Sequence, residues 1–504
     1  MDGLPRDVTL KPGTMSPYAV QVSVDDSHPL AYVSERFLSF ALDTSQVVGG
    51  KWWNPSAGQV ELGSGTLDAP LFDFNRYRLD LLASALAPAY LRLGGSEADK
   101  VYYDLVAGGD SRPLIPPGYH SFLKRSQWDA ACEFARRNGL GLVFTLNAGP
   151  ASRKSDGSWN TGNAESLLTY TAQQGHQVDV WELGNEVNVF FSVHGWRSRI
   201  SPRRYGADLK SARQLLDRLA TGACLASQGS AFWPVFGELP LHWMGFTRRT
   251  LKLAGSLVDQ VGWHYYPQQS RRGPAATRRA SPTRLLNPRY LDEVGHWAGE
   301  MLRWRDQYAP GKPLWMGETG NAQFGGEPGV SDCYISGLWW LDQLGMLART
   351  GHQVVIRQTL CGMDYGMLDD GLAPRPDYWN SLLWKLLMGQ QVYAVQLRGE
   401  CRKMLRAYAH STPGALTTSV TVLVLNLDRQ RSVRVSFPQY SGRRFGLYYI
   451  STPDVLGRQV MLNGERLQIA DAALPTLQPA WQEIAETPRI LLNPLSYAFI
   501  RFAD

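Results

Sequence analysis

The chain has 504 residues, of which 44% are hydrophobic and 11% aromatic, and this composition favours a globular protein with more than one buried core over a disordered chain. Its net charge is +6 and its isoelectric point is near 9.0, which suits an acidic partner without identifying one. No apolar run reaches transmembrane length, and the five cysteines show neither metal-ligand spacing nor the pattern of a disulfide framework. We therefore expect two or more globular domains, no membrane span and free thiols.

The first predicted element is a β-hairpin over residues 18–34, where polar and apolar residues alternate around an Asp25-Asp26 turn. From residue 37 onward, short apolar runs alternate with amphipathic segments. The predicted strands are Leu38–Asp43, Tyr90–Gly94, Leu142–Asn147, Val178–Gly184, Trp233–Gly237, Val261–Tyr266, Leu314–Gly317 and Val354–Thr359; the clearest helices are 126–138, 202–219, 288–307 and 330–351. Near-continuous apolar strands that alternate with helices are typical of a parallel sheet, and eight of them predict an α/β fold closed into a (β/α)8 TIM barrel.

The helical period disappears after about residue 387. The segments that follow are β-branched, aromatic and alternating, with turns between them: Thr418–Asn426, Ser432–Phe437, Phe445–Ser451 and Ser496–Phe502. They predict a second, antiparallel β-sandwich domain, which the N-terminal hairpin joins. The expected division is N-terminal strands at 1–34, a catalytic barrel at 35–388 and a sandwich at 389–504.

Two motifs each deliver a glutamate at the end of an apolar, strand-like run. Val-Trp-Glu-Leu-Gly-Asn-Glu-Val-Asn at 180–188 carries Glu186, and Pro-Leu-Trp-Met-Gly-Glu-Thr-Gly at 313–320 carries Glu318. Cleavage of a glycosidic bond needs one carboxyl that donates a proton and one that is ionised. The Asn185 amide beside Glu186 is placed to hold a sugar hydroxyl. The alternative is two ordinary strand-end glutamates bonded to backbone amides, but the pair with these flanking residues favours catalysis.

Five further motifs give the chain a family resemblance. They are Phe-Leu-Ser at 37–39 leading to Asp43, Ala-Tyr-Leu-Arg-Leu-Gly-Gly-Ser at 89–96, Trp-His-Tyr-Tyr at 263–266, Ile-Arg-Gln at 356–358 and Pro-Asp-Tyr-Trp-Asn-Ser-Leu-Leu-Trp-Lys at 376–385. With the two glutamate motifs, they make the chain similar to the heparanase and β-glucuronidase family of retaining glycoside hydrolases, and to its bacterial heparanases in particular. The C-terminal sandwich adds only a weak resemblance.

The resemblance implies a role for each residue around the two glutamates. Glu186 corresponds to the general acid/base after the fourth strand, and Glu318 corresponds to the nucleophile. Tyr266 matches a tyrosine that bonds the nucleophile, and His264 supports the pair, although both could simply pack in the barrel core. We expect a like-charged neighbour to raise one carboxyl pKa, so that Glu186 stays protonated while Glu318 ionises.

The resemblance also implies a pocket for glucuronic acid. Backbone amides of Gly325 and Gly326, after Phe324, correspond to a loop that receives the sugar carboxylate, and Tyr365 to a tyrosine that meets the same group. Asp43 and Ser96 match positions that bond ring hydroxyls. Ser96 replaces a threonine, and Ser45 stands where the animal members have asparagine, so the fine substrate preference is left open. The alternative for the two glycines is an ordinary loop.

Two loops that follow predicted strands contain arginines and no acidic residue. These are 194–204, with Arg197, Arg199, Arg203 and Arg204, and 267–289, with Arg271, Arg272, Arg278, Arg279, Arg284 and Arg289. In a barrel, both loops rise on the catalytic face, and the planar guanidinium suits sulfate. We expect Arg271 and Arg272 to bind a sulfated polymer. The alternative is a solvated surface that serves solubility.

The hypothesis is therefore a retaining endo-β-D-glucuronidase that cleaves glucuronic acid–glucosamine linkages in heparan sulfate or a related acidic polysaccharide. An exo-β-glucuronidase of the same family is the first alternative, and a non-catalytic carbohydrate-binding protein is the second. We expect a monomer that uses no cofactor and no metal and binds no nucleic acid. The first residues lack the pattern of a signal peptide, but the substrate implies a secreted or periplasmic protein.

Overall fold

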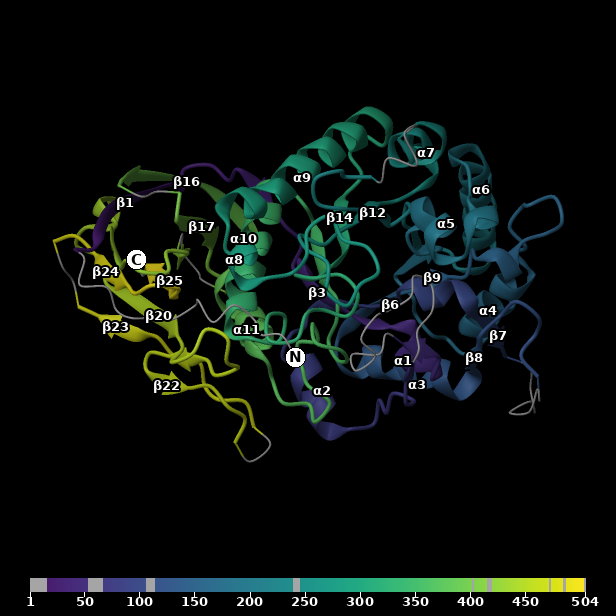
Figure 1. The fold of residues 1–504 in the computed structure, drawn as a ribbon, viewed down its shortest axis with the longest axis horizontal. Coiled ribbons are helices and arrows are strands. Elements are labelled where there is room, and N and C mark those ends of the chain that lie inside the picture. Colours follow the sequence, from purple (N-terminus) through teal and green to yellow (C-terminus); the bar gives the residue numbers. More distant parts are fainter. Residues whose placement is uncertain are drawn as a thin grey trace.

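The computed structural model describes residues 16–52, 67–105, 114–238, 245–400, 403–414, 419–470, 473–483 and 486–502. Its two main sheets lie at opposite ends of the molecule, with the parallel sheet on the right of Figure 1 and the mainly antiparallel one on the left. The predicted combination of a barrel and a second, antiparallel sheet is confirmed. The boundaries at residues 34 and 388 stay a prediction.

The parallel sheet consists of β3 (Leu38–Asp43), β6 (Ala89–Gly94), β9 (Leu140–Leu146), β10 (Val180–Leu183), β11 (Cys224–Leu225), β12 (Ser230–Phe232), β13 (Val261–Tyr265), β14 (Leu314–Thr319) and β15 (Val354–Arg357). Their order is β11-β10-β9-β6-β3-β15-β14-β13-β12. Both ends of this path belong to one short segment, because β11 and β12 are separated only by residues 226–229. The sheet therefore closes on itself, with β11 and β12 as a split fifth strand.

The fifth strand was predicted in the wrong place. Residues 233–237, expected to form it, make a tight turn after β12, in which Trp233 and Gly237 exchange backbone hydrogen bonds of 2.7 and 2.8 Å. The true strand runs through Cys-Leu-Ala-Ser-Gln-Gly-Ser-Ala-Phe at 224–232. Small and polar residues interrupt its apolar pattern. The more apolar and aromatic residues 233–237 were therefore predicted as the strand instead.

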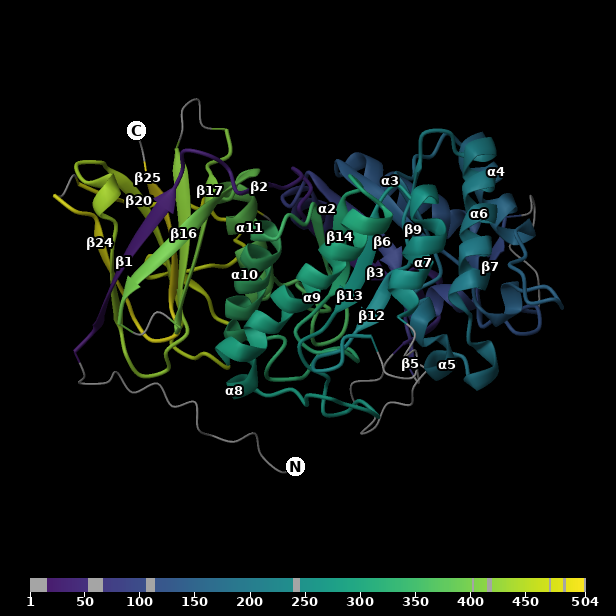
Figure 2. The same cartoon turned by 90° about the horizontal axis from the view of Figure 1, so that it is seen from above.

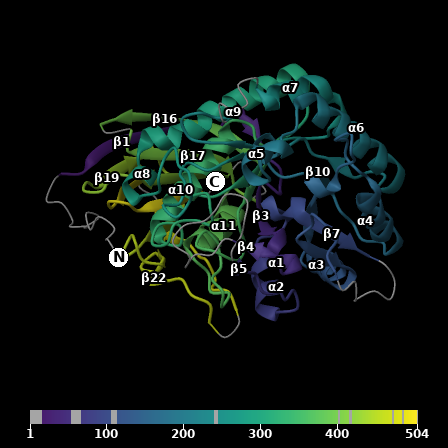
Figure 3. The same ribbon diagram turned by 45° about the vertical axis from the view of Figure 1, so that its right-hand side comes forward.

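The helices are α1 (Thr44–Val48), α2 (Tyr77–Ser84), α3 (Arg125–Arg137), α4 (Gly162–Gln173), α5 (Phe190–Val193), α6 (Pro202–Leu219), α7 (Phe246–Ala254), α8 (Pro282–Leu285), α9 (Pro288–Tyr308), α10 (Tyr334–Arg349) and α11 (Pro376–Leu387). Sequence signals set several of their ends. Ser201 accepts a hydrogen bond from the Arg204 N–H at the start of α6, with Pro202 at the first helical position. Figure 3 shows α4, α6 and α7 around the outside of the barrel on the side of β10.

The second sheet contains β1 (Tyr18–Asp25), β2 (Ala31–Tyr32), β16 (Gln391–Gly399), β17 (Leu405–Ser411), β18 (Val420–Asn426), β19 (Val433–Ser436), β20 (Phe445–Ser451), β21 (Met461–Leu462), β22 (Glu465–Arg466), β23 (Ala480–Gln482), β24 (Arg489–Leu492) and β25 (Tyr497–Phe502). Apolar side chains from β1, β16, β17, β18, β19, β24 and β25 pack together in a core separate from that of the barrel. Two small pairs complete the fold: β4 (Lys51–Trp52) with β5 (Leu67–Asp68), and β7 (Val101–Asp104) with β8 (Ser121–Lys124).

The predicted N-terminal hairpin is wrong, although the segment does join the second sheet. β1 and β2 do not pair with each other as hairpin strands; both pair antiparallel with β16, at residues 394–399 and 391–392 respectively. β1 also pairs parallel with β19. The segment thus behaves as one interrupted strand along the long edge of β16, which offers more backbone partners than a two-strand hairpin. Thr418, the expected start of β18, lies outside the described residues.

Helix α10 connects the two parts of the molecule. All its residues from Tyr334 to Ala348 are buried, and Figure 2 shows α10 and α11 between the barrel and the strands β16 and β17. The Tyr408 hydroxyl of β17 donates to Asp342 at 2.6 Å. A Cβ at Gly345 would lie 2.3 Å from the Tyr408 ring, so only glycine allows this close approach. The sandwich therefore packs tightly on the barrel through α10.

Within the described ranges, no helix is long and apolar enough to cross a bilayer. Cys132, Cys224, Cys333 and Cys361 are free, in agreement with the expectation of free thiols. Cys401 lies outside the described residues.

Candidate active site

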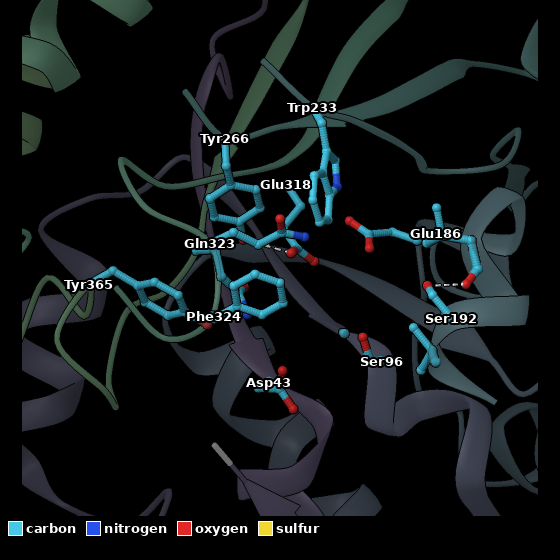
Figure 4. Close-up of a pocket in the computed structure, with 14 residues that line it drawn as sticks. Asp43, Ser96, Glu186, Ser192, Trp233, Tyr266, Glu318, Gln323, Phe324 and Tyr365 are labelled. Carbon is cyan, nitrogen blue, oxygen red and sulfur yellow. Dashed lines mark hydrogen bonds between the residues drawn. The ribbon is translucent and has the colours of Figure 1, made fainter. Parts of the chain in front are cut away.

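The two glutamates stand at the same end of the barrel. Glu318 lies within the seventh strand, β14, and Glu186 follows the fourth strand, β10, after a left-handed Gly184. Glu186 itself has φ 52° and ψ 47°, an uncommon conformation for a residue with a side chain. Such backbone strain costs on the order of 1 kcal/mol and persists only where surrounding contacts impose it. The turn aims the Glu186 carboxyl towards Trp233 and Glu318 (Figure 4).

His264 lies between the two carboxylates on the strand β13. Its Nδ1 is 3.1 Å from Glu186 Oε1 and 3.9 Å from Glu318 Oε2. One carboxylate oxygen of each glutamate and a ring nitrogen of His264 all lie within 4.8 Å of one another. The structure thus brings together side chains that are 132 residues apart in the sequence (318 − 186).

Glu318 is held at both oxygens. Arg92 Nη1 donates to Oε2 at 2.7 Å, and the Tyr266 hydroxyl donates to Oε1 at 2.7 Å. Glu318 is only 7% exposed, and Arg92 is fully buried. Charge-assisted hydrogen bonds of this length fix the carboxylate rotamer and stabilise its ionised form.

Arg92 also organises the rest of the centre. Its Nε donates to Glu182 at 2.9 Å, and its Nη2 donates to the Asn185 side-chain oxygen at 2.9 Å. The amide N–H of Asn185 is held by Asp99 at 2.8 Å. Arg92 was assigned no role from the sequence, although a signal was present. A charged residue in the middle of an apolar barrel strand, Leu-Arg-Leu, must be paired if it is buried.

The two carboxyl groups have pKa values shifted in opposite directions. Burial raises the pKa of Glu186, and the nearby Glu318 charge adds to this, against a hydrogen bond from His264. Burial also opposes ionisation of Glu318, but the charges of His264 and Arg92 and the hydrogen bond from Tyr266 outweigh it and lower its pKa. Desolvation, rather than the like-charged neighbour named in the sequence analysis, is the main cause for Glu186. The arrangement therefore favours protonation of Glu186 and ionisation of Glu318.

A pocket opens between these carboxylates and the barrel rim (Figure 4). Six residues singled out from the sequence line it: Asp43, Ser96, Glu186, Tyr266, Glu318 and Tyr365. The others are Gly95, Val189, Ser192, Val193, Trp233, Gln323, Phe324 and Gln358. Of these, Gly95, Trp233 and Gln358 belong to predicted strands or motifs, but no sequence signal indicated that they lie in the pocket.

Asp43 caps helix α1 and faces the pocket with its other oxygen. Its Oδ1 accepts hydrogen bonds from the Ser45 amide at 3.0 Å and the Ser45 hydroxyl at 2.7 Å. A Cβ on Gly95 would lie 2.3 Å from Oδ2, so glycine at that position leaves room for the carboxyl. Burial raises the pKa of Asp43 to about 7. Ser45 therefore supports Asp43, and Asp43 can present a neutral or a charged group to a ligand.

Phe324, Gly325 and Gly326 form a loop of three consecutive left-handed residues, with φ of 65°, 82° and 86°. The carbonyl of Gly325 accepts from the amides of Asp364 and Tyr365, at 3.0 and 3.3 Å. A Cβ on Gly326 would lie 2.6 Å from the Tyr365 nitrogen. The glycines thus let the loop lie against the Tyr365 segment. Phe324 and Tyr365 line the pocket, whereas Gly325 and Gly326 are not among the lining residues.

The arginines of the loop 267–289 have acidic partners from other parts of the chain. Arg272 is paired with Asp364 at 2.7 Å and also donates to the Gly326 carbonyl at 2.8 Å, and its side chain is 12% exposed. Arg271 pairs with the buried Glu327 at 2.7 Å. The guanidinium of Arg272 is therefore occupied in holding the glycine loop, which corrects the expectation that it is available to polymer sulfate. A loop without acidic residues of its own can thus have acidic side chains from other segments beside it.

Several arginines of the two loops do remain exposed. They are Arg197, Arg199, Arg203, Arg279, Arg284 and Arg289, and within the described ranges none of them has an acidic side chain at ion-pair distance. Arg271 is also 41% exposed despite its partner. Arg278, in contrast, is buried against Tyr290 and paired with Glu293 at 2.6 Å.

Glu186, His264 and Glu318 are spaced closely enough to offer three ligand atoms to a cation. Both oxygens of Glu318, however, already accept hydrogen bonds from Arg92 and Tyr266. A metal ion there would lie close to the buried Arg92 guanidinium, whose positive charge opposes the binding of a cation. The geometry fits two carboxyl groups prepared for proton transfer and nucleophilic attack better than a metal centre.

Comparison with known proteins agrees with this site. Residues 19–345 match the family model described as "Glycosyl hydrolase family 79, N-terminal domain". Heparanase of Gallus gallus is 32% identical over 492 residues, covering 86% of this chain and 90% of the relative. Inactive heparanase-2 of Homo sapiens is 28% identical over 576 residues, covering 99% of this chain and 90% of that protein. A relative named as inactive is thus nearly as similar to this chain as a heparanase is, so overall identity does not separate the two.

Among solved structures, the GH51 arabinofuranosidase from Xanthomonas axonopodis pv. citri superposes with a TM-score of 0.69. The superposition covers 96% of this chain and 100% of the arabinofuranosidase chain, and the two sequences are 14% identical. This likeness shows a shared fold.

Proposed function

The chain belongs to glycosyl hydrolase family 79 and is a glycoside hydrolase, and from this premise we propose that it is a retaining endo-β-D-glucuronidase. The proposed substrate is heparan sulfate or a related acidic polysaccharide, cleaved at glucuronic acid–glucosamine linkages. The observation that carries the proposal is the pair Glu186 and Glu318, whose oxygens lie within 4.8 Å and whose pKa values shift in opposite directions.

The proposed mechanism is a double displacement. Ionised Glu318 attacks the anomeric carbon while Glu186 transfers its proton to the leaving oxygen, which gives a glycosyl ester on Glu318 and a free sugar hydroxyl. Glu186, now ionised, removes a proton from water, and the water oxygen displaces Glu318. One oxygen of each carboxyl lies within 4.8 Å of the other, and this close approach favours a double displacement, because inverting enzymes keep the two carboxyl groups farther apart to fit a water molecule.

The side chains around Glu318 support an active enzyme over a binding protein that has lost catalysis. Arg92 and Tyr266 hold Glu318 ionised at the cost of a buried guanidinium and a buried hydroxyl. A carbohydrate-binding protein has no need for a carboxyl pair with opposite protonation. Overall identity does not make this distinction, because a relative named as inactive is 28% identical and a heparanase is 32% identical.

Three features support a glucuronide in an acidic polymer. Tyr365 and the left-handed glycine loop lie together beside the pocket, where they could receive a sugar carboxylate. Exposed arginines without acidic partners suit sulfate groups beyond the pocket. Heparanases are among the relatives. We propose a monomer, because both glutamates and their supporting side chains come from one chain, and a secreted or periplasmic location, where such polymers are met.

The test compares a sulfated heparan-type polymer, an aryl β-glucuronide and the matching aryl β-glucoside. We expect internal cleavage of the polymer into oligosaccharides, and rates on the glucoside at least about a hundredfold lower because it leaves the carboxylate-binding donors unpaired. Release of single glucuronic acid residues would favour the exo alternative. No turnover of the polymer or the glucuronide would reject the proposal.

The arginine loops provide a finer test of polymer binding. Replacing Arg197, Arg199, Arg279 and Arg284 with alanine is expected to lower cleavage of the polymer several-fold and to weaken its salt dependence, with little effect on the aryl glucuronide. Arg434→Ala and Arg489→Ala, exposed positions on the second sheet, are the control. Equal loss on both substrates would contradict the role in polymer binding.

A further inference from the structure

The turn after the fifth strand carries an unusual combination of strain and exposure. Val235, a β-branched residue, has φ 77°, and the residue is 56% exposed. Phe236 beside it is 51% exposed. A β-branched residue in the left-handed region costs on the order of 1–3 kcal/mol and is found mainly where function requires it.

Contacts on both sides hold this turn in place. The Val235 amide donates to the Glu293 carboxylate, which is itself paired with buried Arg278. A Cβ at Gly237 would lie 2.6 Å from the Trp297 ring, so the turn rests directly on helix α9. The surrounding protein therefore imposes this conformation, and it presents two apolar side chains to solvent.

Trp233, the first residue of the turn, forms part of the active-site wall. It is 8% exposed, lines the pocket together with Glu186, and contacts Phe324 edge-on with ring centroids 6.2 Å apart. In Figure 4 its indole hangs over the space between Glu318 and Glu186. Trp233, Val189, Ala231 and Phe324 make a small apolar cluster separate from the barrel core.

The position of Trp233 around the barrel assigns it to one side of the scissile bond. Asp43 ends the first strand, β3, and Tyr365 follows the eighth, β15, so the glucuronic acid ring is expected on that side. Trp233 follows the fifth strand, across the barrel from the first and between those that lead to Glu186 and His264. Because Glu186 protonates the leaving oxygen, the leaving sugar must lie on its side of the cleft.

We propose that the turn 233–237 forms the binding subsite for the leaving-group sugar, in which the apolar face of a glucosamine-type ring stacks on the Trp233 indole. Val235 and Phe236 extend this surface for the next ring of the polymer. Aromatic faces bind the C–H face of a pyranose through apolar contact, and the turn supplies them without a charged group. This inference rests on the proposed function, because it names the part of that substrate that Trp233 binds.

The first test compares a substrate that has no leaving-group sugar with one that has such a sugar. β-Glucuronyl fluoride fills the glucuronic acid pocket alone, whereas a heparan-type tetrasaccharide also fills the leaving-group subsite. For Trp233→Ala, we expect kcat/KM on the tetrasaccharide to fall at least tenfold more than on the fluoride, and Trp233→Phe should recover most of that difference. Trp481→Ala, an exposed tryptophan of the second sheet, is the matched control and should show no such difference.

The second test measures transfer, and as a ratio it does not depend on the amount of folded enzyme. An N-acetylglucosaminide acceptor binds the same subsite, and its hydroxyl displaces Glu318 from the glucuronyl ester as Glu186 takes the proton. The ratio of transfer to hydrolysis should fall several-fold in Trp233→Ala and less in Phe236→Ala.

The outcomes distinguish the two proposals. If the wild type hydrolyses the fluoride and the tetrasaccharide but Trp233→Ala loses both equally and keeps its transfer ratio, Trp233 only packs the wall and the subsite is refuted. If the wild type hydrolyses neither substrate, the proposed function itself fails.

Discussion

Glu186 and Glu318 are almost equally buried, at 6% and 7% exposure, yet their pKa values shift in opposite directions. Glu318 has a guanidinium on one oxygen and a tyrosine hydroxyl on the other, whereas the carboxyl of Glu186 lies at hydrogen-bond distance from the His264 ring. Burial alone would keep both carboxyls neutral. The difference shows that the donors aimed at each carboxylate, rather than its depth, set the opposite directions of the two pKa shifts.

The backbone around Glu318 is also more regular than the backbone around Glu186. Glu318 belongs to a hydrogen-bonded strand, and its register with β13 shifts between Trp263 and His264. Glu186 lies on a left-handed turn outside its strand. A nucleophile must keep one orientation, whereas an acid/base must give up and regain a proton while facing first a sugar oxygen and then water. The fixed position suits the first role and the turn suits the second.

The largest expected effect comes from removing the ionised member of the pair. Glu318→Gln should lower kcat on both polymer and aryl glucuronide by about 10⁴-fold or more, because no glycosyl ester can form. A mechanism-based glucuronide inactivator followed by peptide mass spectrometry should label Glu318 in the wild type. A label on Glu186 would reverse the assignment.

Removing Glu186 should lower the rate of cleavage less than removing Glu318 does. Glu186→Ala is expected to lower polymer cleavage by about 10²–10⁴-fold, the usual contribution of general acid–base catalysis. Azide should restore turnover of β-glucuronyl fluoride and yield the β-azide, since azide needs no general base and the fluoride needs no strong acid. An α-azide product, or no rescue, would argue against Glu186 as the acid/base.

Tyr266→Phe sharpens the comparison by removing one of the donors that distinguish the carboxyls. Loss of a hydrogen bond to the ionised form raises the pKa of Glu318, so the acidic limb of the kcat/KM profile should move to a pH higher by about 1. Activity below that limb should fall about tenfold, and the alkaline limb should move little. A profile displaced on the alkaline side alone would assign the hydroxyl to Glu186 instead.

A third carboxyl, Asp43, is buried with a serine and an amide as hydrogen-bond partners, and its pKa is raised to about 7. Because the folded state keeps a proton that the unfolded chain loses above its ordinary pKa of 3.8, this group makes stability fall as pH rises towards 7. Asp43→Asn should therefore reduce the stability difference between pH 5 and pH 8 by about 3 kcal/mol. Urea unfolding at the two pH values measures it; an unchanged difference would show that Asp43 is already ionised at pH 5.

The sequence was informative where local chemistry repeats a pattern and silent where contacts come from distant parts of the chain. Strand β3 and helix α6 were predicted with the bounds that the structure has. The split fifth strand was missed because Ala-Ser-Gln-Gly breaks its apolar run, and the N-terminal hairpin was misassigned because its partner, β16, lies more than 360 residues away (391 − 25 = 366).

The same limit applies to the site. Glu186, Glu318 and Tyr266 stand in motifs with recognisable flanks, and the structure brings them together with His264. The pairing of Arg272 with Asp364 could not be foreseen, because the acid belongs to another loop. Arg92 could have been found, since a lone charge inside a barrel strand requires buried partners.

The burial of α10 has a consequence for how the protein unfolds. Its residues contact the barrel on one side and the second sheet on the other, and Gly345 fits the Tyr408 ring without space for a single methyl group. If the second sheet unfolded alone, or the barrel did, the apolar helix α10 would become exposed to water. We therefore expect one cooperative melting transition for the whole chain, with no separate melting of the barrel. A fragment ending at residue 388 should aggregate rather than persist as an active barrel. The second sheet is therefore expected to be required for activity, because the barrel does not stay folded without it.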